Sequence, residues 1–135
     1  MNLETASKII QFISEKNADG LRKLFSEEVI SNDRYLEKDI QKLFSFCDGK
    51  ISSYEKIAIG QESNIDGGKN STEYNTKYRF IINETSYLLY YKYTPKNSYE
   101  IQKEGISSIK IIKETDEDKY FCYWNELKPG IFVPE

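Results

Sequence analysis

The hydrophobic pattern of this sequence changes its period once, at Asp48-Gly49. Before that point, apolar residues recur every three or four positions, as on one face of a helix, in three stretches that include Leu3 to Ile13, Leu21 to Val29 and Leu36 to Cys47. After it, apolar and polar residues alternate, as in strands with one buried face. The order predicts an α+β domain in which N-terminal helices pack on an antiparallel sheet.

The expected boundaries follow from the same pattern, with helices at about 2–48 and the sheet at about 50–125. Strands are expected at residues 50–60, 74–83, 86–94, 105–114 and 119–125. The stretch from Asn64 to Ser71 is expected to be a flexible loop. The prolines of residues 126–135 favour an ordered, extended C-terminal strap. All 135 residues fit one domain, 1–135.

Residues 87–93 read YLLYYKY and are apolar on both faces of the expected strand. One face carries Tyr87, Leu89, Tyr91 and Tyr93, and we expect the helices to cover it. The other face carries Leu88, Tyr90 and Lys92, which no predicted helix reaches. The sequence therefore predicts that this second face is an interface.

Two groups of side chains are candidates for binding. The candidate partner-binding residues are those of the second face together with the charged turn and the tryptophan that follow, namely Leu88, Tyr90, Lys92, Asp116, Glu117, Asp118 and Trp124. Tyrosine and tryptophan suit such surfaces because they combine an apolar body with a polar group. The candidate interior pocket is lined by Tyr54, Tyr78, Phe80 and Tyr91, although core packing explains Tyr78 and Phe80 more simply.

The composition excludes several classes of chemistry. The chain has no histidine, which removes the commonest general base and metal ligand. Its two cysteines, Cys47 and Cys122, are expected to be buried free thiols and cannot supply a zinc site alone. A net charge of -3 with interspersed lysines offers no basic face for nucleic acid, and no stretch is long enough for a membrane span. We expect no cofactor, no metal and no catalytic residues.

Local strings resemble known domains. Residues 15–26 resemble the first helix, tight turn and second helix of nuclear transport factor 2-like domains. The strings at 46–54, FCDGKISSY, and 129–135, PGIFVPE, resemble the bacterial family called domain of unknown function 5104, which lies in that superfamily. The resemblance implies a cone-like fold with a curved sheet wrapped around the helices. It implies no catalytic residues. The family that it points to includes many small lipoproteins of Gram-positive bacteria.

These observations favour a non-enzymatic binding protein with a protein partner. The preferred role is a bacterial immunity protein, or antitoxin, whose acidity steers it to a basic toxin. Self-association as a homodimer competes with this role. One alternative is the ligand-binding soluble domain of a cell-envelope lipoprotein, and another is an isomerase-like enzyme with a Tyr/carboxylate pocket.

The expected compartment depends on the N-terminus. Residues 1–10 lack the basic start and apolar run of a signal peptide, so the sequence as written favours the cytoplasm. A lipoprotein whose leader has been removed is the alternative.

Overall fold

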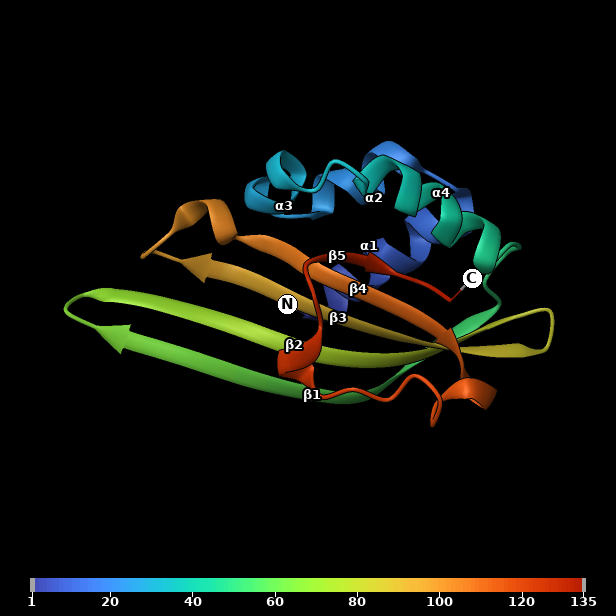
Figure 1. The fold of residues 1–135 in the computed structure, drawn as a ribbon. Helices are drawn as coiled ribbons and strands as arrows, with labels where there is room; N and C mark the ends of the chain where they lie inside the picture. The colour runs from blue at the N-terminus through green and yellow to red at the C-terminus, as the bar shows by residue number, and fades with distance from the viewer. Residues whose placement is uncertain (1, 135) are drawn as a thin grey trace.

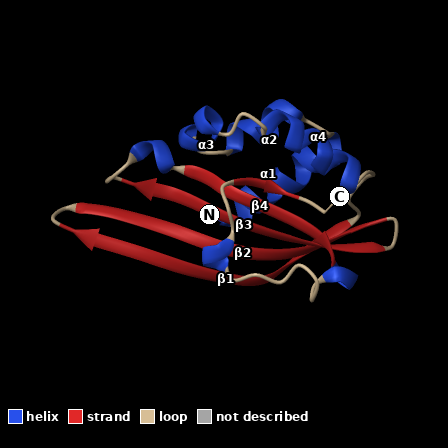
Figure 2. Ribbon diagram, in the orientation of Figure 1, coloured by secondary structure: helices blue, strands red, loops and turns tan. Residues whose placement is uncertain are grey.

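The computed structural model describes residues 2–134, and the side chains of residues 5–134. Within that range, helices lie on one side of a sheet and form a two-layer α+β domain (Figures 1 and 2). The helices are α1 (Asn2–Glu15), α2 (Ala18–Leu24), α3 (Glu27–Asn32) and α4 (Leu36–Phe46). The strands are β1 (Ser53–Asp66), β2 (Lys69–Ile82), β3 (Thr85–Asn97), β4 (Gly105–Lys113) and β5 (Gly130–Phe132). Short 3-10 turns are η1 (Ile101–Lys103), η2 (Glu114–Asp116) and η3 (Trp124–Glu126).

The second predicted helix is two helices in the structure. The break falls at Phe25-Ser26, where the Ser26 Oγ accepts a hydrogen bond from the Val29 N–H at 3.3 Å and caps α3. The Ser26 N–H donates to the Ile106 carbonyl at 2.9 Å, which ties this linker to β4. The helix expected at 21–29 was therefore wrong in its continuity, because a local cap and a bond to the sheet replace one helical turn.

The sheet is mixed and open, with strand order β1-β2-β3-β4-β5. The first four strands form an antiparallel meander, whereas β5 pairs in parallel with β4. The expected all-antiparallel sheet is thus correct for β1 to β4 only. The strand expected at 119–125 was wrong, since those residues are turns and η3, and the last strand comes from the expected strap. Glu135, the end of that strap, lies outside the described residues.

Both hairpins of the long strands use two-residue turns. Gly67 and Gly68 have φ of 57° and 83°, and Asn83 and Glu84 have φ of 48° and 68°. Two consecutive left-handed residues are what a tight hairpin requires to match the twist of its strands. The flexible loop expected at 64–71 was therefore wrong, because β1 and β2 continue to within one turn of each other.

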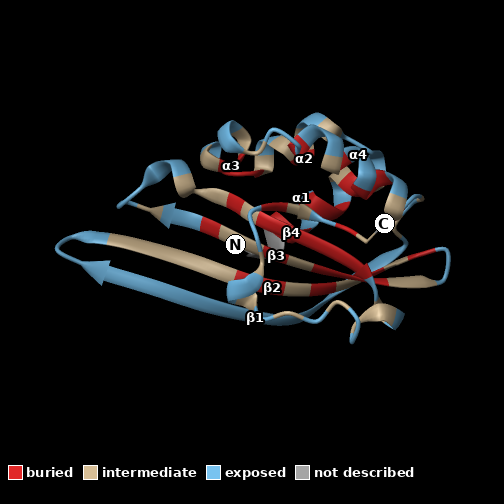
Figure 3. Ribbon diagram, in the orientation of Figure 1, coloured by how far each residue is buried: buried red, intermediate tan, exposed pale blue. Residues whose placement is uncertain are grey.

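The core lies between the helices and one face of the sheet. Tyr87, Leu89 and Tyr91 of β3 point into it and are 6%, 0% and 0% exposed, which confirms the predicted face for these three residues, and Tyr93 is half-buried against the same core. The side chain of Leu3, expected on the buried face of α1, lies outside the described residues. Phe80 stacks on Tyr87 with ring centroids 5.2 Å apart. Strand β1 is exposed along its whole length, because the helices cover the sheet only from β2 onward (Figure 3).

Candidate binding surface on the outer face of the sheet

The face of the sheet opposite the helices, called here the outer face, is built from rows of cross-strand neighbours. The first row is Glu55, Arg79, Leu88 and Ile112. The second row is Ala58, Lys77, Tyr90 and Lys110, and the third is Gly60, Asn75, Lys92 and Ser108. Beyond the third row, Glu62 lies directly opposite Glu73. Apart from Glu55, which forms an ion pair with Arg79, the first two rows are therefore apolar and basic, whereas two acidic residues face each other at the other end.

Residues 114–129, called here the crossover segment, run from the end of β4 to β5 (Figure 1). In the first two rows the residues of β3 and β4 are the covered ones, since Leu88, Ile112 and Lys110 are 1%, 0% and 6% exposed, whereas those of β1 are exposed. Arg79 holds the start of this segment, since its Nε and Nη2 donate to Glu114 at 2.9 and 2.7 Å. The hydrogen bonds from Arg79 lower the pKa of Glu114. Lys77 donates to Glu117 at 2.7 Å and fixes the next part.

Tyr90 lies at the centre of the covered region. Its ring meets Trp124 edge to face, with centroids 5.8 Å apart. The ammonium groups of Lys77 and Lys110 each lie 5.4 Å from its ring centroid. Burial raises the pKa of the Tyr90 hydroxyl. The tyrosine is thus held between a tryptophan and two cations of the same chain.

The structure brings together Leu88, Tyr90, Glu117 and Trp124, which the sequence singled out as partner-binding residues. They meet because the crossover segment packs on β3 within the same chain, and Leu88 is only 1% exposed there. The expectation that Leu88 lies on an uncovered face was therefore wrong, because the crossover segment supplies the cover.

The remaining candidate partner-binding residues are more accessible. Lys92 is half-buried in the third row, Asp116 is half-buried in η2, and Asp118 is exposed. Their role in binding a partner stays a prediction.

The candidate interior pocket lies in the core. Tyr78, Phe80 and Tyr91 are 1%, 0% and 0% exposed and pack under the helices. Tyr54 is 40% exposed at the margin, where its hydroxyl lies 3.0 Å from Ser7 Oγ. Burial raises the pKa of Tyr78, whose hydroxyl has no hydrogen-bond partner among the described residues. The ligand-binding role of these four residues stays a prediction.

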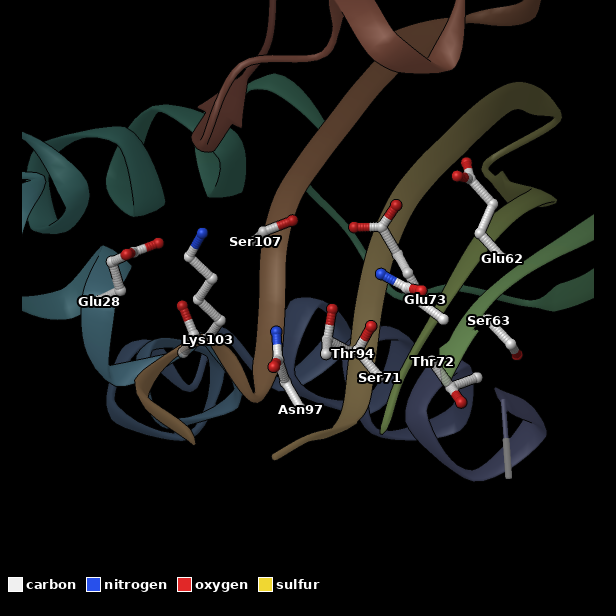
Figure 4. A pocket seen from close by; sticks show the side chains of 12 residues that line it. Glu28, Glu62, Ser63, Ser71, Thr72, Glu73, Thr94, Asn97, Lys103 and Ser107 are labelled. Atoms are coloured by element: carbon white, nitrogen blue, oxygen red, sulfur yellow. The ribbon is translucent and has the colours of Figure 1, made fainter. Parts of the chain in front are cut away.

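The acidic end of the outer face is a polar cleft of about 600 Å³ (Figure 4). Strands β1, β2, β3 and β4 form its floor, and α3 and η1 form one side. Its lining consists of Ser26, Glu28, Glu62, Ser63, Asn64, Ser71, Thr72, Glu73, Thr94, Asn97, Lys103 and Ser107.

Two features of this cleft distinguish it from a surface that binds no ligand. Glu62 and Glu73 face each other, and neither has an ion-pair partner within residues 5–134. Thr94 is only 7% exposed, and its side chain lines the cleft (Figure 4). The two carboxylates are therefore available to contact a ligand.

Sequence reasoning missed this cleft. The signal was the dipeptide Gly67-Gly68, since a two-residue turn there pairs Asp66 with Lys69 and, four residues further along each strand, Glu62 with Glu73. A loop at residues 64–71 predicts no such pairing, so the register of Glu62 and Glu73 was not foreseen.

The fold and this face define an α+β protein with an open mixed sheet and a polar cleft at one end. The chain belongs to the family described as Domain of unknown function (DUF5104), which it matches over residues 8–114. The string at 46–54 lies inside the matched range and the string at 129–135 lies outside it. A comparison with curated proteins gives no match. Among the described helices, none has the length and apolar character needed to cross a membrane.

Proposed function

We propose that this protein is a non-enzymatic binding protein with a nuclear transport factor 2-like fold, and that it holds a basic protein partner at the acidic end of its outer face. The observation that carries the proposal is the pair Glu62 and Glu73, which face each other without a counter-charge within residues 5–134. Like charges directly opposite each other in a sheet are unfavourable. A lysine or arginine of a partner would remove that repulsion.

The free edge of β1 provides the second part of the surface. Strand β1 has 14 residues and pairs with β2 on one side, and no strand within residues 2–134 pairs with its other side. Its unpaired N–H and C=O groups can bind an extended segment of another chain. Ile57 and Ile59 are 39% and 44% exposed and offer apolar contacts beside this edge.

The geometry of the two parts suits one extended, basic segment. Glu62 lies on β1 itself, so a segment paired to that strand brings its side chains next to the carboxylates. The net charge of -3 adds long-range attraction for a basic partner.

Among binding roles, we favour an immunity protein that neutralises a bacterial toxin. Rigid strands with uncompensated acidic groups are suited to covering a basic surface of an enzyme. The nuclear transport factor 2-like assignment is supported by the α1–α2 hairpin, in which Asn17 caps α2 by accepting a hydrogen bond from the Gly20 N–H at 2.9 Å. The isomerase alternative needs a buried carboxylate beside a tyrosine, and no Asp or Glu is buried within residues 5–134.

The test is direct binding to the protein encoded by the adjacent open reading frame. We expect a 1:1 complex by size-exclusion chromatography with light scattering, with affinity that falls as salt concentration rises. The same experiment on the protein alone detects a homodimer. Absence of binding to the protein encoded by the adjacent open reading frame would overturn the immunity role. A stable homodimer formed through β1 would overturn the proposal that a basic partner binds there.

A further inference from the structure

A second cavity, of about 360 Å³, lies between the crossover segment and the second row of the outer face. On the sheet side it is lined by Lys77, Tyr90 and Lys110, and on the segment side by residues that include Phe121 and Trp124. Aromatic walls with a few charged groups are typical of sites for small organic ligands, which occupy cavities of about 300–1,000 Å³.

Lys110 is the unusual group in this cavity. Lys110 is only 6% exposed. Its Nζ donates hydrogen bonds to the Tyr120 carbonyl and, at 3.3 Å, to Cys122 Sγ. Its other neighbours are the rings of Tyr90 and Phe132. No carboxylate within residues 5–134 pairs with it, although buried charges in proteins are normally paired.

The other charged groups of the cavity do not change this balance. Lys77 is already paired with Glu117 at 2.7 Å, so these two charges cancel. The cavity therefore carries one positive charge without a counter-charge, next to apolar walls.

We propose that this cavity binds a small organic anion, an aromatic or short aliphatic carboxylate, whose carboxylate pairs with Lys110 and whose apolar body packs on Phe121 and Trp124. The site is separate from the acidic cleft and its occupant has the opposite charge. A bound ligand would also stabilise the crossover segment against the sheet, because it would contact both.

Trp124 is the single tryptophan of the chain, so its fluorescence reports on this cavity alone. The probes are 4-phenylbutyrate, the neutral 4-phenyl-1-butanol and the cationic 4-phenylbutylamine. We expect a saturable change of emission with the acid, with affinity at least tenfold higher than that of the alcohol or the amine.

The charge dependence is tested by Lys110→Met, which removes the charge and is shorter than lysine by the terminal Nζ atom. This variant should lose at least tenfold in affinity for the acid and keep its affinity for the alcohol. Lys113→Met is the matched control, because Lys113 is an exposed residue of the same strand and should leave both affinities unchanged. Equal affinities for the three probes, no saturable binding of the acid, or unchanged affinity for the acid in Lys110→Met would each overturn the proposal.

A second measurement on the wild-type protein does not depend on the folding of a variant. Cys122 lies beside Lys110, whereas Cys47 is 1% exposed and burial raises its pKa to about 12, so Cys122 is the thiol that reagents reach. We expect Cys122 to favour the anionic reagent iodoacetate over neutral iodoacetamide at least threefold more than free glutathione does, and 4-phenylbutyrate to protect it. Cys122→Ser identifies the reacting thiol. The same preference as glutathione, or no protection by the acid, would contradict an anion site.

Discussion

Tyr90 and Trp124 meet edge to face, with ring centroids 5.8 Å apart and ring planes at 65°. This contact joins the middle of the sheet to a segment more than thirty residues later in the chain. That segment, the crossover segment, covers the second apolar face of β3. Aromatic pairs of this geometry contribute about 0.5–1.5 kcal/mol beyond the area they bury.

Tyr90→Ala should therefore weaken folding. We expect a loss of about 2 kcal/mol in the free energy of unfolding, from the ring contact and the buried area together. Urea unfolding followed by circular dichroism measures it. Tyr35→Ala is the control, because Tyr35 is 53% exposed and its loss should change stability by no more than about 0.5 kcal/mol. Equal losses in the two variants would show that the crossover segment does not stabilise the sheet.

The ion pair between Arg79 and Glu114 makes stability depend on pH. Hydrogen bonds from Arg79 lower the pKa of Glu114 below its ordinary 4.5, so the folded state binds the proton less tightly than the unfolded state does. The stabilisation is present above pH 4.5 and is lost as the pH falls through the lower, folded value. We expect Glu114→Gln to flatten the loss of thermal stability between about pH 5 and pH 3.

Glu84→Gln provides the comparison for that pH series. Glu84 is an exposed turn residue with no ion-pair partner within residues 5–134, and its substitution should preserve the slope of the wild type. If Glu114→Gln and the wild type lose stability in parallel, the anchoring of the crossover segment by Arg79 is wrong.

The turn between β2 and β3 stores backbone strain that a single substitution should release. Glu84 has φ of 68°, a left-handed conformation that costs a non-glycine residue about 1–2 kcal/mol. Glu84→Gly should raise the free energy of unfolding by about 1 kcal/mol, since Asn-Gly is a preferred pair for this turn. Thermal unfolding by calorimetry measures the gain.

The other hairpin offers the reverse experiment. Gly67 has φ of 57°, and a Cβ added there would meet no atom within 4 Å. Gly67→Ala should therefore lower stability by about 1 kcal/mol through the backbone alone. Changes of the same sign in Glu84→Gly and Gly67→Ala would contradict the turn geometry.

The sequence predicted local features better than it predicted long-range ones. The helix-covered face of β3 was correct, since Tyr87, Leu89 and Tyr91 follow a strict period of two. Residues 119–125 also alternate, with Phe121 and Tyr123 exposed and Cys122 and Trp124 partly buried, yet they form no strand. Alternation reports that one side of a segment is covered, and it does not report whether the backbone pairs with a neighbour.

The candidate site was predicted in part for the same reason. The sequence predicts that Tyr90, Glu117 and Trp124 belong to one surface, but it carries no sign that they contact one another within one chain. Strand β5 has three residues, too few for a period to be visible. The acidic cleft depends on the pairing of Glu62 with Glu73, which the polar sequence around Gly67 concealed.

Replacing both carboxylates tests the central claim most directly. In Glu62→Gln/Glu73→Gln the repulsion across the two strands is removed, so the variant should be at least as stable as the wild type. Glu27→Gln is the matched control, because Glu27 is an exposed carboxylate of α3 that does not line the cleft.

The decisive measurement is the calorimetric affinity of these variants for the product of the adjacent open reading frame. We predict that Glu62→Gln/Glu73→Gln binds at least tenfold more weakly than the wild type, with less dependence on salt, whereas Glu27→Gln binds as the wild type does. Unchanged affinity in the folded double variant would contradict the proposal that the acidic end of the outer face binds the partner.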